Sequence, residues 1–356
     1  MSDFPVQTLA QVQHGMDLGW HTGAQVYGSV QGQTRVDLAV GEARPGVPMT
    51  TSTIVEWASA TKPIPSVAIG LLWQRGLLDL DDPVCLHIPE FAAAGKQAVT
   101  IRHLLSHTGG LTSTITGIAP SEEMVADICA APLADGWIPG TRNAYNSVAM
   151  WIVAELVSRV SGRPFTEFIR NEIFEPACMD DCWIGMSADT YRVHQDRIAV
   201  IPGFAPSGTE AWVTWGRPTG GGHGPIAQLG HFYEALLDGR LLSARTLEAM
   251  TAHQVSGGWD EYLQETVDRG LGFMLGSSNP AHGYGTRASA RSFGHGGRTW
   301  SVTFADPSER VVVAVYWNGM GDPDTQARRL PDLLDALYDD LAVLTERTDD
   351  DAHFAC

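Results

Sequence analysis

Lysine is nearly absent from this chain of 356 residues. Of 23 basic residues, only Lys62 and Lys96 are lysine, and all the others are arginine. Such a preference is typical of a GC-rich coding bias. Under that bias, each lysine that remains is a candidate for a specific role.

A basic stripe is lacking as well, because the formal net charge is -18. Binding to nucleic acid needs clustered lysine and arginine, so this class of function is excluded. No apolar run reaches the roughly eighteen residues of a membrane span. The start, MSDFPVQTLAQVQ, lacks the basic segment and apolar stretch of a secretory signal. We therefore expect a cytoplasmic protein that contacts neither nucleic acid nor membrane.

Metal and cofactor motifs are missing too. The five cysteines are scattered and odd in number, and Cys178 and Cys182 stand four apart without a CxxC motif or a paired histidine. There is no HExxH, no GxxxxGK[ST] and no GxSxG nucleophile elbow. We expect reduced thiols, no metal and no cofactor, and a fold other than the α/β-hydrolase fold.

Hydrophobic periodicity predicts strands near both ends of the chain and helices between them. Alternation around Gly32 predicts a hairpin over 24–40, and apolar runs predict strands over 271–275, 300–305 and 311–317. The last helix is expected to carry Pro331 in its first turn. The helical pattern covers residues 5–19, 64–75, 100–106, 121–130, 146–160, 165–173, 225–238, 243–253 and 329–345.

This order predicts an α+β fold, an α/β sandwich. A mixed, mainly antiparallel sheet from both chain ends would be flanked by helices, with a mostly helical insertion beside it. We place the sheet domain at 1–75 and 265–345, the helical domain at 76–264, and a disordered acidic tail at 346–356. The interface between the two domains is a natural place for a pocket.

The stretch EWASATKPIP, residues 56–65, sets Ser59 and Lys62 three apart. On a helical turn this spacing brings the hydroxyl and the amine together, so the lysine could activate the serine as a nucleophile. Pro63 and Pro65 fit only near a helix start, and the N–H groups at that end suit an oxyanion hole. The alternative is an ordinary N-cap serine beside a solvated lysine.

Two further segments could complete such a site. IPGTRNAYNS places Tyr145 at the start of an apolar helix, where its phenol could share a proton with Lys62. SFGHGGRTW offers His295, Gly296 and Gly297, whose backbone could approach a ligand closely. The alternatives are a tyrosine that packs at a helix end and a plain tight turn.

Together these segments resemble the serine hydrolases built like class C β-lactamases, which include family VIII esterases, D-amino-acid peptidases and transacylases. SATK (59–62) matches the nucleophile motif, TIRHLLSHTGGL (100–111) resembles LLxHTSGL, and PGTRNAYNS (139–147) resembles PGxxxxYSN. GRPFTEFIRNEIFEPACM (162–179) is similar to the stretch that ends in PLGM. GGGHGPIAQLGHFYEALLDGRLLS (220–243) resembles the family's GGLxST segment, and FGHGG (293–297) stands where β-lactamases carry Lys-Thr-Gly. The resemblance covers nearly the whole chain.

The resemblance implies a class C β-lactamase-like fold and a set of site residues. It makes Ser59 the nucleophile, Lys62 its base and Tyr145 the proton-transfer partner. The oxyanion hole would use the backbone N–H groups of Ser59 and Arg298. The substrate would contact Ser147, His295, Gly296, Gly297 and Trp300.

Four positions bear on which members of the family this chain resembles and on which residues act in the site. Ser147 replaces the asparagine of Tyr-x-Asn, which weakens a β-lactamase assignment, and Cys178 replaces the glycine of PLGM. Lys-Thr-Gly cannot occur, because the other lysine, Lys96, precedes glutamine. His107 is a tempting base, but in the LLSHTGGL segment we expect it to serve loop structure.

The expected reaction is a two-step acyl transfer through an acyl-serine at Ser59. The partners are a small-molecule acyl donor, an ester or amide, and an amine or alcohol acceptor, as in natural-product transacylases. Trp137, Trp215 and Trp300 would favour transfer by lining an apolar mouth, unless they simply pack the core. Water as acceptor, giving an esterase or amidase, is the alternative. Further alternatives, ranked below these, are a β-lactamase, a D-amino-acid peptidase and a non-catalytic descendant of the family. A non-catalytic descendant would usually have lost the serine, the lysine or the tyrosine, and this chain keeps all three.

Overall fold

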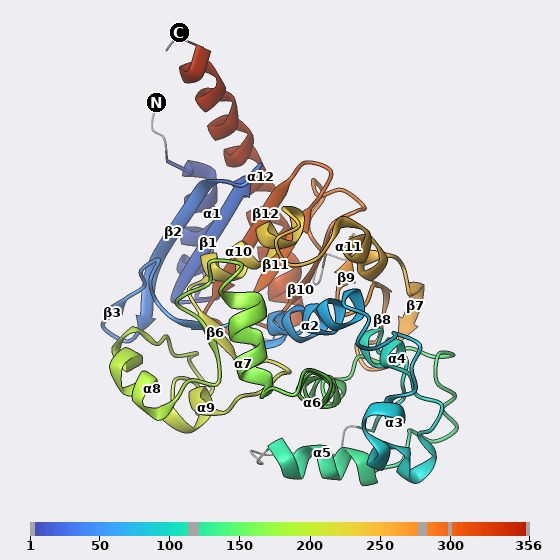
Figure 1. The fold of residues 1–356 in the computed structure, drawn as a ribbon. Coiled ribbons are helices and arrows are strands. Elements are labelled where there is room, and N and C mark those ends of the chain that lie inside the picture. The colour runs from blue at the N-terminus through green and yellow to red at the C-terminus, as the bar shows by residue number, and fades with distance from the viewer. Residues whose placement is uncertain (1–3, 113–120, 277–282, 298–300, 354–356) are drawn as a thin grey trace.

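A single large sheet organises the fold (Figure 1). The computed structural model describes residues 4–112, 121–276, 283–297 and 301–353. The nine strands of the sheet follow the order β3-β2-β1-β12-β11-β10-β9-β8-β7. Their bounds are β1 Gly23–Val30, β2 Gln33–Arg44, β3 Val47–Pro48, β7 Val255–Asp260, β8 Glu265–Arg269, β9 Met274–Leu275, β10 Phe293–Gly296, β11 Val302–Asp306 and β12 Val311–Trp317.

Antiparallel pairing joins the two ends of the chain at the centre of this sheet. Strand β1 pairs with β12 in the register Val26↔Val315 and with β2 in the register Val26↔Leu38. Gln31 and Gly32 turn the β1–β2 hairpin with φ of 54° and 75°, as a two-residue turn of positive φ requires. The predicted α+β fold, with a sheet built from both chain ends, is confirmed.

Helices cover both faces of the sheet. Helices α1 (Val6–Asp17) and α12 (Pro323–His353) pack on one face, where leucines of α12 lie against Gly28. Helices α2 (Pro63–Gln74) and α10 (Ile226–Leu237) cover the other, where Tyr27 lies against Gly230. The two apolar faces form separate core clusters, because alternate residues of a strand point to opposite sides.

Short helices and a small second sheet form the remainder. The sheet has the order β4-β6-β5, with bounds β4 Val55–Glu56, β5 Trp183–Ile184 and β6 Gly222–Gly224. The helices are α3 Val84–His87, α4 Ile101–Leu105, α5 Ser121–Ala130, α6 Ala149–Ser161, α7 Phe165–Ile169, α8 Ala188–His194, α9 Glu210–Thr214 and α11 Ala244–Thr251. Short 3₁₀ or π turns, η1 Ala58–Thr61, η2 Pro89–Gly95, η3 Arg170–Phe174 and η4 Gln195–Arg197, connect them.

The C-terminal helix is longer than the prediction. It begins at Pro323 rather than near 329, because the Asp322 carboxylate accepts a hydrogen bond from Thr325 N at 2.7 Å and Pro323 fits the first helical position. Pro331 therefore lies inside the helix. The helix continues to His353 and projects beyond the body (Figure 1), and the disorder expected from 346 stays a prediction.

Other differences concern strands. The β7–β8 hairpin was missed, because its strands are mostly polar, β7 contains two glycines, and neither strand has an apolar alternation. Strand β7 also joins the large sheet from within the range assigned to the helical domain, and the proposed division into two domains stays a prediction. The strand predicted over 271–275 is reduced to β9, and the prediction over 300–305 corresponds to β11, although residue 300 lies outside the described residues.

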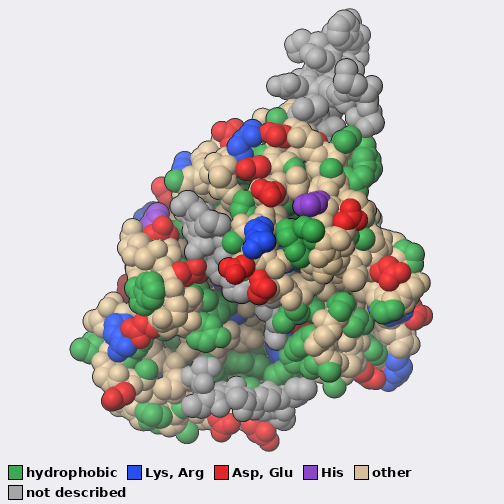
Figure 2. Space-filling view, turned by 180° about the vertical axis from the view of Figure 1, so that it is seen from behind, with side chains coloured by type: hydrophobic (Ala, Val, Ile, Leu, Met, Phe, Trp, Pro, Cys, Tyr) green, Lys and Arg blue, Asp and Glu red, His purple; other side chains and the backbone are tan. Residues whose placement is uncertain are grey.

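The surface is mixed in charge and hollowed on one side. Seen from behind, it has a hollow below its centre that shows hydrophobic side chains, and basic side chains are scattered singly among acidic ones (Figure 2). In the described part of the chain, no helix has the length and apolarity needed to cross a membrane.

The surroundings of Lys96 indicate a structural role. Its side chain is fully buried, and Nζ donates to the carbonyl oxygens of Ala93 and Cys129 at 2.8 Å each and also to that of Ala131. Burial lowers the pKa of this amine from its ordinary value. The lysine thus ties the end of α5 to the segment at 89–95.

Replacing this lysine with methionine, Lys96→Met, should destabilise the fold by about 2–3 kcal/mol, because three buried carbonyl oxygens lose their donor. Urea denaturation of both proteins measures the change. The control is Arg192→Ala at a surface ion pair with Asp189, where the side chains are 63% and 88% exposed and the loss should stay below about 0.5 kcal/mol. Equal losses in the two variants would contradict the structural role of Lys96.

Candidate active site

Ser59 lies on a sharp turn at the start of a helix. Strand β4 ends at Glu56, the chain turns through Ala58 with φ of 48°, and the 3₁₀ turn Ala58–Thr61 leads directly into α2. Positive φ at a residue with a side chain is strained and persists only where the surroundings enforce it. The turn leaves Ser59 partly exposed between buried neighbours, as a nucleophile requires.

Lys62 is the buried group that holds the serine. Its side chain is 1% exposed, and Nζ donates to Ser59 Oγ at 2.9 Å and to the carbonyl oxygen of Thr219 at 2.7 Å. Nζ also lies 5.0 Å from the centre of the Tyr145 ring. The structure therefore brings together the serine, lysine and tyrosine that the sequence singled out.

Electrostatic contacts act directly on the Tyr145 phenol. Burial raises its pKa, but the charge of Lys62, hydrogen bonds with Lys62 and Ser59, and the charge of Arg269 together lower that pKa below its ordinary value. The ionised phenol is thus more accessible than in water, which suits a group that accepts and returns a proton.

Backbone contacts fix the position of Tyr145. Its N–H lies 2.9 and 3.1 Å from the two carboxylate oxygens of Asp260, at the end of β7. Asp260 forms a fully buried ion pair with Arg269 of β8, with 2.6 Å between Oδ2 and Nη2. Sequence reasoning missed both residues, because only the tertiary fold brings the β7–β8 hairpin to the tyrosine.

His107 serves the loop beside the tyrosine. Its ring lies 4.9 Å from that of Tyr145, its Nδ1 lies 3.2 Å from Asn146 N, and its carbonyl accepts from Ala144 N at 3.1 Å. Burial, with the nearby charges of Arg269, Lys62 and His295, holds its pKa well below the usual range. A neutral, hydrogen-bonded ring of this kind supports the predicted structural role.

The glycine-rich segment at 293–297 lies beside the turn that carries Ser59. A Cβ on Gly297 would stand 2.7 Å from the carbonyl oxygen of Trp57, so only glycine allows this close approach. His295 is buried, with Nδ1 2.6 Å from the carbonyl oxygen of Gly296 and its ring 5.9 Å from that of Tyr145. The predicted oxyanion donor Arg298 and the predicted contact residue Trp300 lie outside the described residues, so those two roles stay predictions.

Asn146 and Ser147, which follow Tyr145, lie in different environments. Asn146 caps α6 by accepting from Ala149 N at 3.1 Å, and its Nδ2 donates to the carbonyl oxygen of Leu111 at 2.5 Å. Ser147 is exposed and stands on the solvent side of this cap. Its predicted contact with substrate stays a prediction.

Two of the three tryptophans singled out earlier pack against other side chains, Trp137 in the core and Trp215 half-buried at its edge. Trp137 is buried and donates from Nε1 to the carbonyl oxygen of Thr108 at 3.0 Å. Trp215 stands in a group of rings, 6.0 Å from Trp151 and 5.8 Å from Trp212. For this pair the structure favours the packing alternative over an apolar mouth.

A buried ion pair supports the segments that carry Ser59 and Thr219. Arg217 Nη2 lies 3.3 Å from Glu56 Oε1, and both side chains are almost completely buried. Glu56 also accepts a hydrogen bond from Trp212 Nε1 at 3.0 Å. The loop whose Thr219 carbonyl oxygen accepts from Lys62 is thereby tied to the strand that leads into the turn carrying Ser59.

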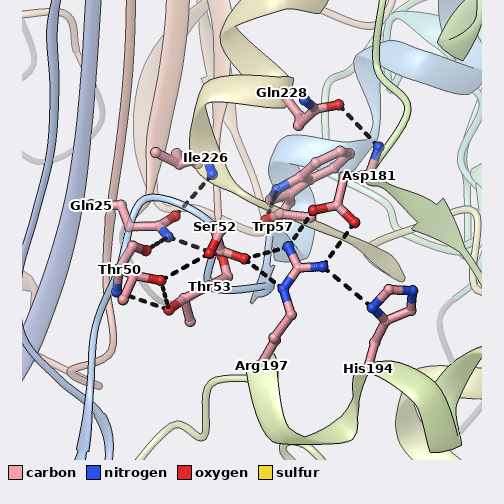
Figure 3. Close-up of polar contacts among 11 residues, drawn as sticks. Gln25, Thr50, Ser52, Thr53, Trp57, Asp181, His194, Arg197, Ile226 and Gln228 are labelled. Carbon is pink, nitrogen blue, oxygen red and sulfur yellow. Dashed lines mark hydrogen bonds and ion pairs between the residues drawn. The ribbon is translucent and has the colours of Figure 1, made fainter.

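Polar side chains also anchor the turn before β4 (Figure 3). Gln25 of β1 donates to the carbonyl oxygens of Thr50 and Thr53 at 2.6 and 2.9 Å. Arg197 donates from Nε to the carbonyl oxygen of Ser52 at 3.1 Å. These contacts fix the segment that leads into the turn carrying Ser59 relative to the large sheet.

Metal ligands are missing around this cluster. The described residues contain no group of three or more His, Cys, Asp or Glu side chains placed to hold a metal ion. The chemistry available to the cluster is that of a serine hydroxyl, an amine and a phenol, which suits nucleophilic and general acid–base catalysis.

Comparison with known proteins connects this geometry to a family. Residues 10–337 match the family model described as Beta-lactamase. Penicillin-binding protein 4* of Bacillus subtilis (strain 168) is 25% identical over 253 residues, which cover 65% of this chain and 54% of that relative. The chain thus spans about half the length of this curated relative.

Two solved structures show the same fold over nearly their whole length. A family VIII carboxylesterase has a TM-score of 0.82 and 25% identity, with 96% of this chain and 98% of the other covered. EstCE1, described as a hydrolase with promiscuous acyltransferase activity, has a TM-score of 0.77 at 19% identity, with 93% and 97% covered. The likeness to EstCE1 concerns the fold alone.

The predicted resemblance is therefore confirmed at the level of family and fold. The match runs through the segments that supply Ser59, Lys62 and Tyr145, which the structure has gathered into one cluster. The chain belongs to the Beta-lactamase family of serine enzymes.

Proposed function

We propose that this chain is a serine acyl-enzyme catalyst that takes an acyl group from a small ester or amide and passes it to an amine or alcohol. One observation carries the proposal: the Lys62 amine lies 2.9 Å from the Ser59 hydroxyl and 5.0 Å from the centre of the Tyr145 ring. A serine with such a base beside it can attack a carbonyl carbon.

In the first step, Ser59 Oγ bonds to the carbonyl carbon, and its proton passes to the pair formed by Lys62 and Tyr145. Because the two groups interact strongly, the proton belongs to the pair rather than to either residue. The pair then protonates the leaving alcohol or amine as the acyl-serine forms. The Ser59 N–H at the helix start would stabilise the oxyanion.

In the second step, an acceptor gives its proton to the same pair and attacks the acyl-serine carbonyl, which releases the product and restores the hydroxyl of Ser59. The exposed ring of Tyr262, called the aromatic ledge below, favours an organic acceptor. Its side chain is 68% exposed, and the ring lies 6.0 Å from that of Tyr145. Exposed aromatic surface next to a reacting centre favours binding of an apolar group over water.

Water as the acceptor is the second candidate, and it would make the chain an esterase or amidase. The similarity to the family VIII carboxylesterase favours this outcome. The small-molecule nature of the donor and acceptor stays a prediction, as does the cytoplasmic location.

The nucleophile is tested by a fluorophosphonate probe that labels activated serines. Ser59→Ala should abolish labelling, and Tyr145→Phe should slow it by about 10²-fold or more, because the proton loses its route. Ser158→Ala, a matched control whose hydroxyl only donates to the Ala154 carbonyl within α6, should label like the wild type. Labelling of Ser59→Ala at the full rate would refute the assignment.

The acceptor is tested by product partitioning. The protein is incubated with p-nitrophenyl esters of short acids, with and without a primary amine or alcohol, and the products are separated by mass. We expect more transfer product than free acid at high acceptor concentration, and a selective loss of transfer in Tyr262→Ala because its ledge is removed. Free acid alone with every acceptor would establish hydrolysis instead.

A further inference from the structure

Burial of the Asp260–Arg269 ion pair costs free energy, because both charges lose their contact with water. Arg269 is 1% exposed and Asp260 is completely buried, with a single short bond between their charged groups. The Nε atom of Arg269 has no hydrogen-bond partner among the described residues. Buried ion pairs of this type often contribute less stability than apolar residues of similar volume, so a role beyond folding accounts better for this one.

The pair is built around Tyr145 rather than around its own hairpin alone. Asp260 accepts from the backbone N–H of Tyr145 as well as from those of Tyr262 and Leu263, both at 2.9 Å. The guanidinium carbon of Arg269 lies 5.5 Å from the centre of the Tyr145 ring. The tyrosine is thereby fixed through its backbone by one member and faced by the charge of the other.

We propose that Arg269, anchored by Asp260, is a positioning residue for Tyr145 that stabilises negative charge on the phenol oxygen while the proton of Ser59 is transferred. This role rests on the proposed acyl-enzyme function. With this role, two cations act on Tyr145: Lys62 from the start of α2 and Arg269 from β8. The sequence predicted only Lys62.

Other side chains also face Tyr145. The ring of His107 is neutral near pH 7, because its pKa is held far below its usual value. Tyr262 approaches through an exposed aromatic ring, and His295 approaches from β10 with its Nδ1 against a backbone carbonyl. The Asp260 carboxylate lies at the backbone N–H of Tyr145, where three peptide N–H groups and the guanidinium disperse its charge.

Removing each charge of the pair in turn should shift the pKa of the Tyr145 phenol in opposite directions. A purely structural role would not produce opposite shifts. Arg269→Gln removes the cation and leaves the carboxylate, so the pKa of the phenol should rise by roughly one pH unit. Asp260→Asn removes the anion and leaves the cation, so that pKa should fall. The acid limb of kcat/KM for a p-nitrophenyl ester should move with it, giving about a tenfold loss for Arg269→Gln below the limb.

Ionisation is measured directly from the ¹³C shift of the tyrosine Cζ, with the Tyr145 signal assigned by Tyr145→Phe. This titration needs no turnover, so the inference is tested even if the proposed function fails. Turnover that persists in Ser59→Ala would show that failure separately. Arg269→Lys, which keeps the charge, should restore most of the wild-type pKa.

Arg329→Gln is the matched control. This arginine is also buried, but it lies 4.0 Å from the ring of Trp317, in the core between the sheet and α12. Its loss should lower stability without moving the Tyr145 titration. Shifts of the same sign in Arg269→Gln and Asp260→Asn, or no shift in either, would overturn the proposal. If Arg269→Gln does not fold, Asp260→Asn alone decides, by the presence or absence of a downward shift.

Discussion

The amine of Lys62 holds three distant parts of the chain in one place. It donates to Ser59 on the neighbouring turn and to the Thr219 carbonyl oxygen, and it lies 5.0 Å from the centre of the Tyr145 ring, just before α6. A buried amine is costly unless such partners surround it. The geometry of the cluster therefore depends on the segments that supply those partners, and much of the surrounding architecture fixes them.

Each segment has its own anchor. The Glu56–Arg217 pair ties the strand before Ser59 to the loop that carries Thr219. The Asp260 carboxylate holds the backbone of Tyr145 from the far end of the large sheet. Ala58, strained with φ of 48°, lies against Gly220 and Gly297. Rigid support of this kind is what a preorganised site needs.

The sequence predicted the parts of this site that local spacing encodes. Ser59 and Lys62 share one helical turn, and Tyr145 precedes an apolar helix, so all three could be recognised. Asp260 and Arg269 could not, because they lie on a polar hairpin whose pairing with the tyrosine exists only in the folded chain. The fold followed from strands at both ends, while the start of the last helix was missed although Asp322 and Pro323 signal it.

The arrangement also explains why two lysines survive in an arginine-rich chain. Lys62 and Lys96 are both fully buried, and each donates to backbone carbonyl oxygens. A compact ammonium group with three donors fits these cages, whereas the larger planar guanidinium of arginine would not. One lysine therefore holds the proposed nucleophile, Ser59, and the other ties two segments of the fold together.

The central claim concerns the bond that Ser59 forms. A crystal structure of the protein after reaction with a slowly released ester tests it most directly. We predict continuous density from Ser59 Oγ to the acyl carbon, with Lys62 still bound to the Thr219 carbonyl and the Tyr145 phenol beside the new bond. An unmodified Ser59, or an acyl group attached to another residue, would contradict it.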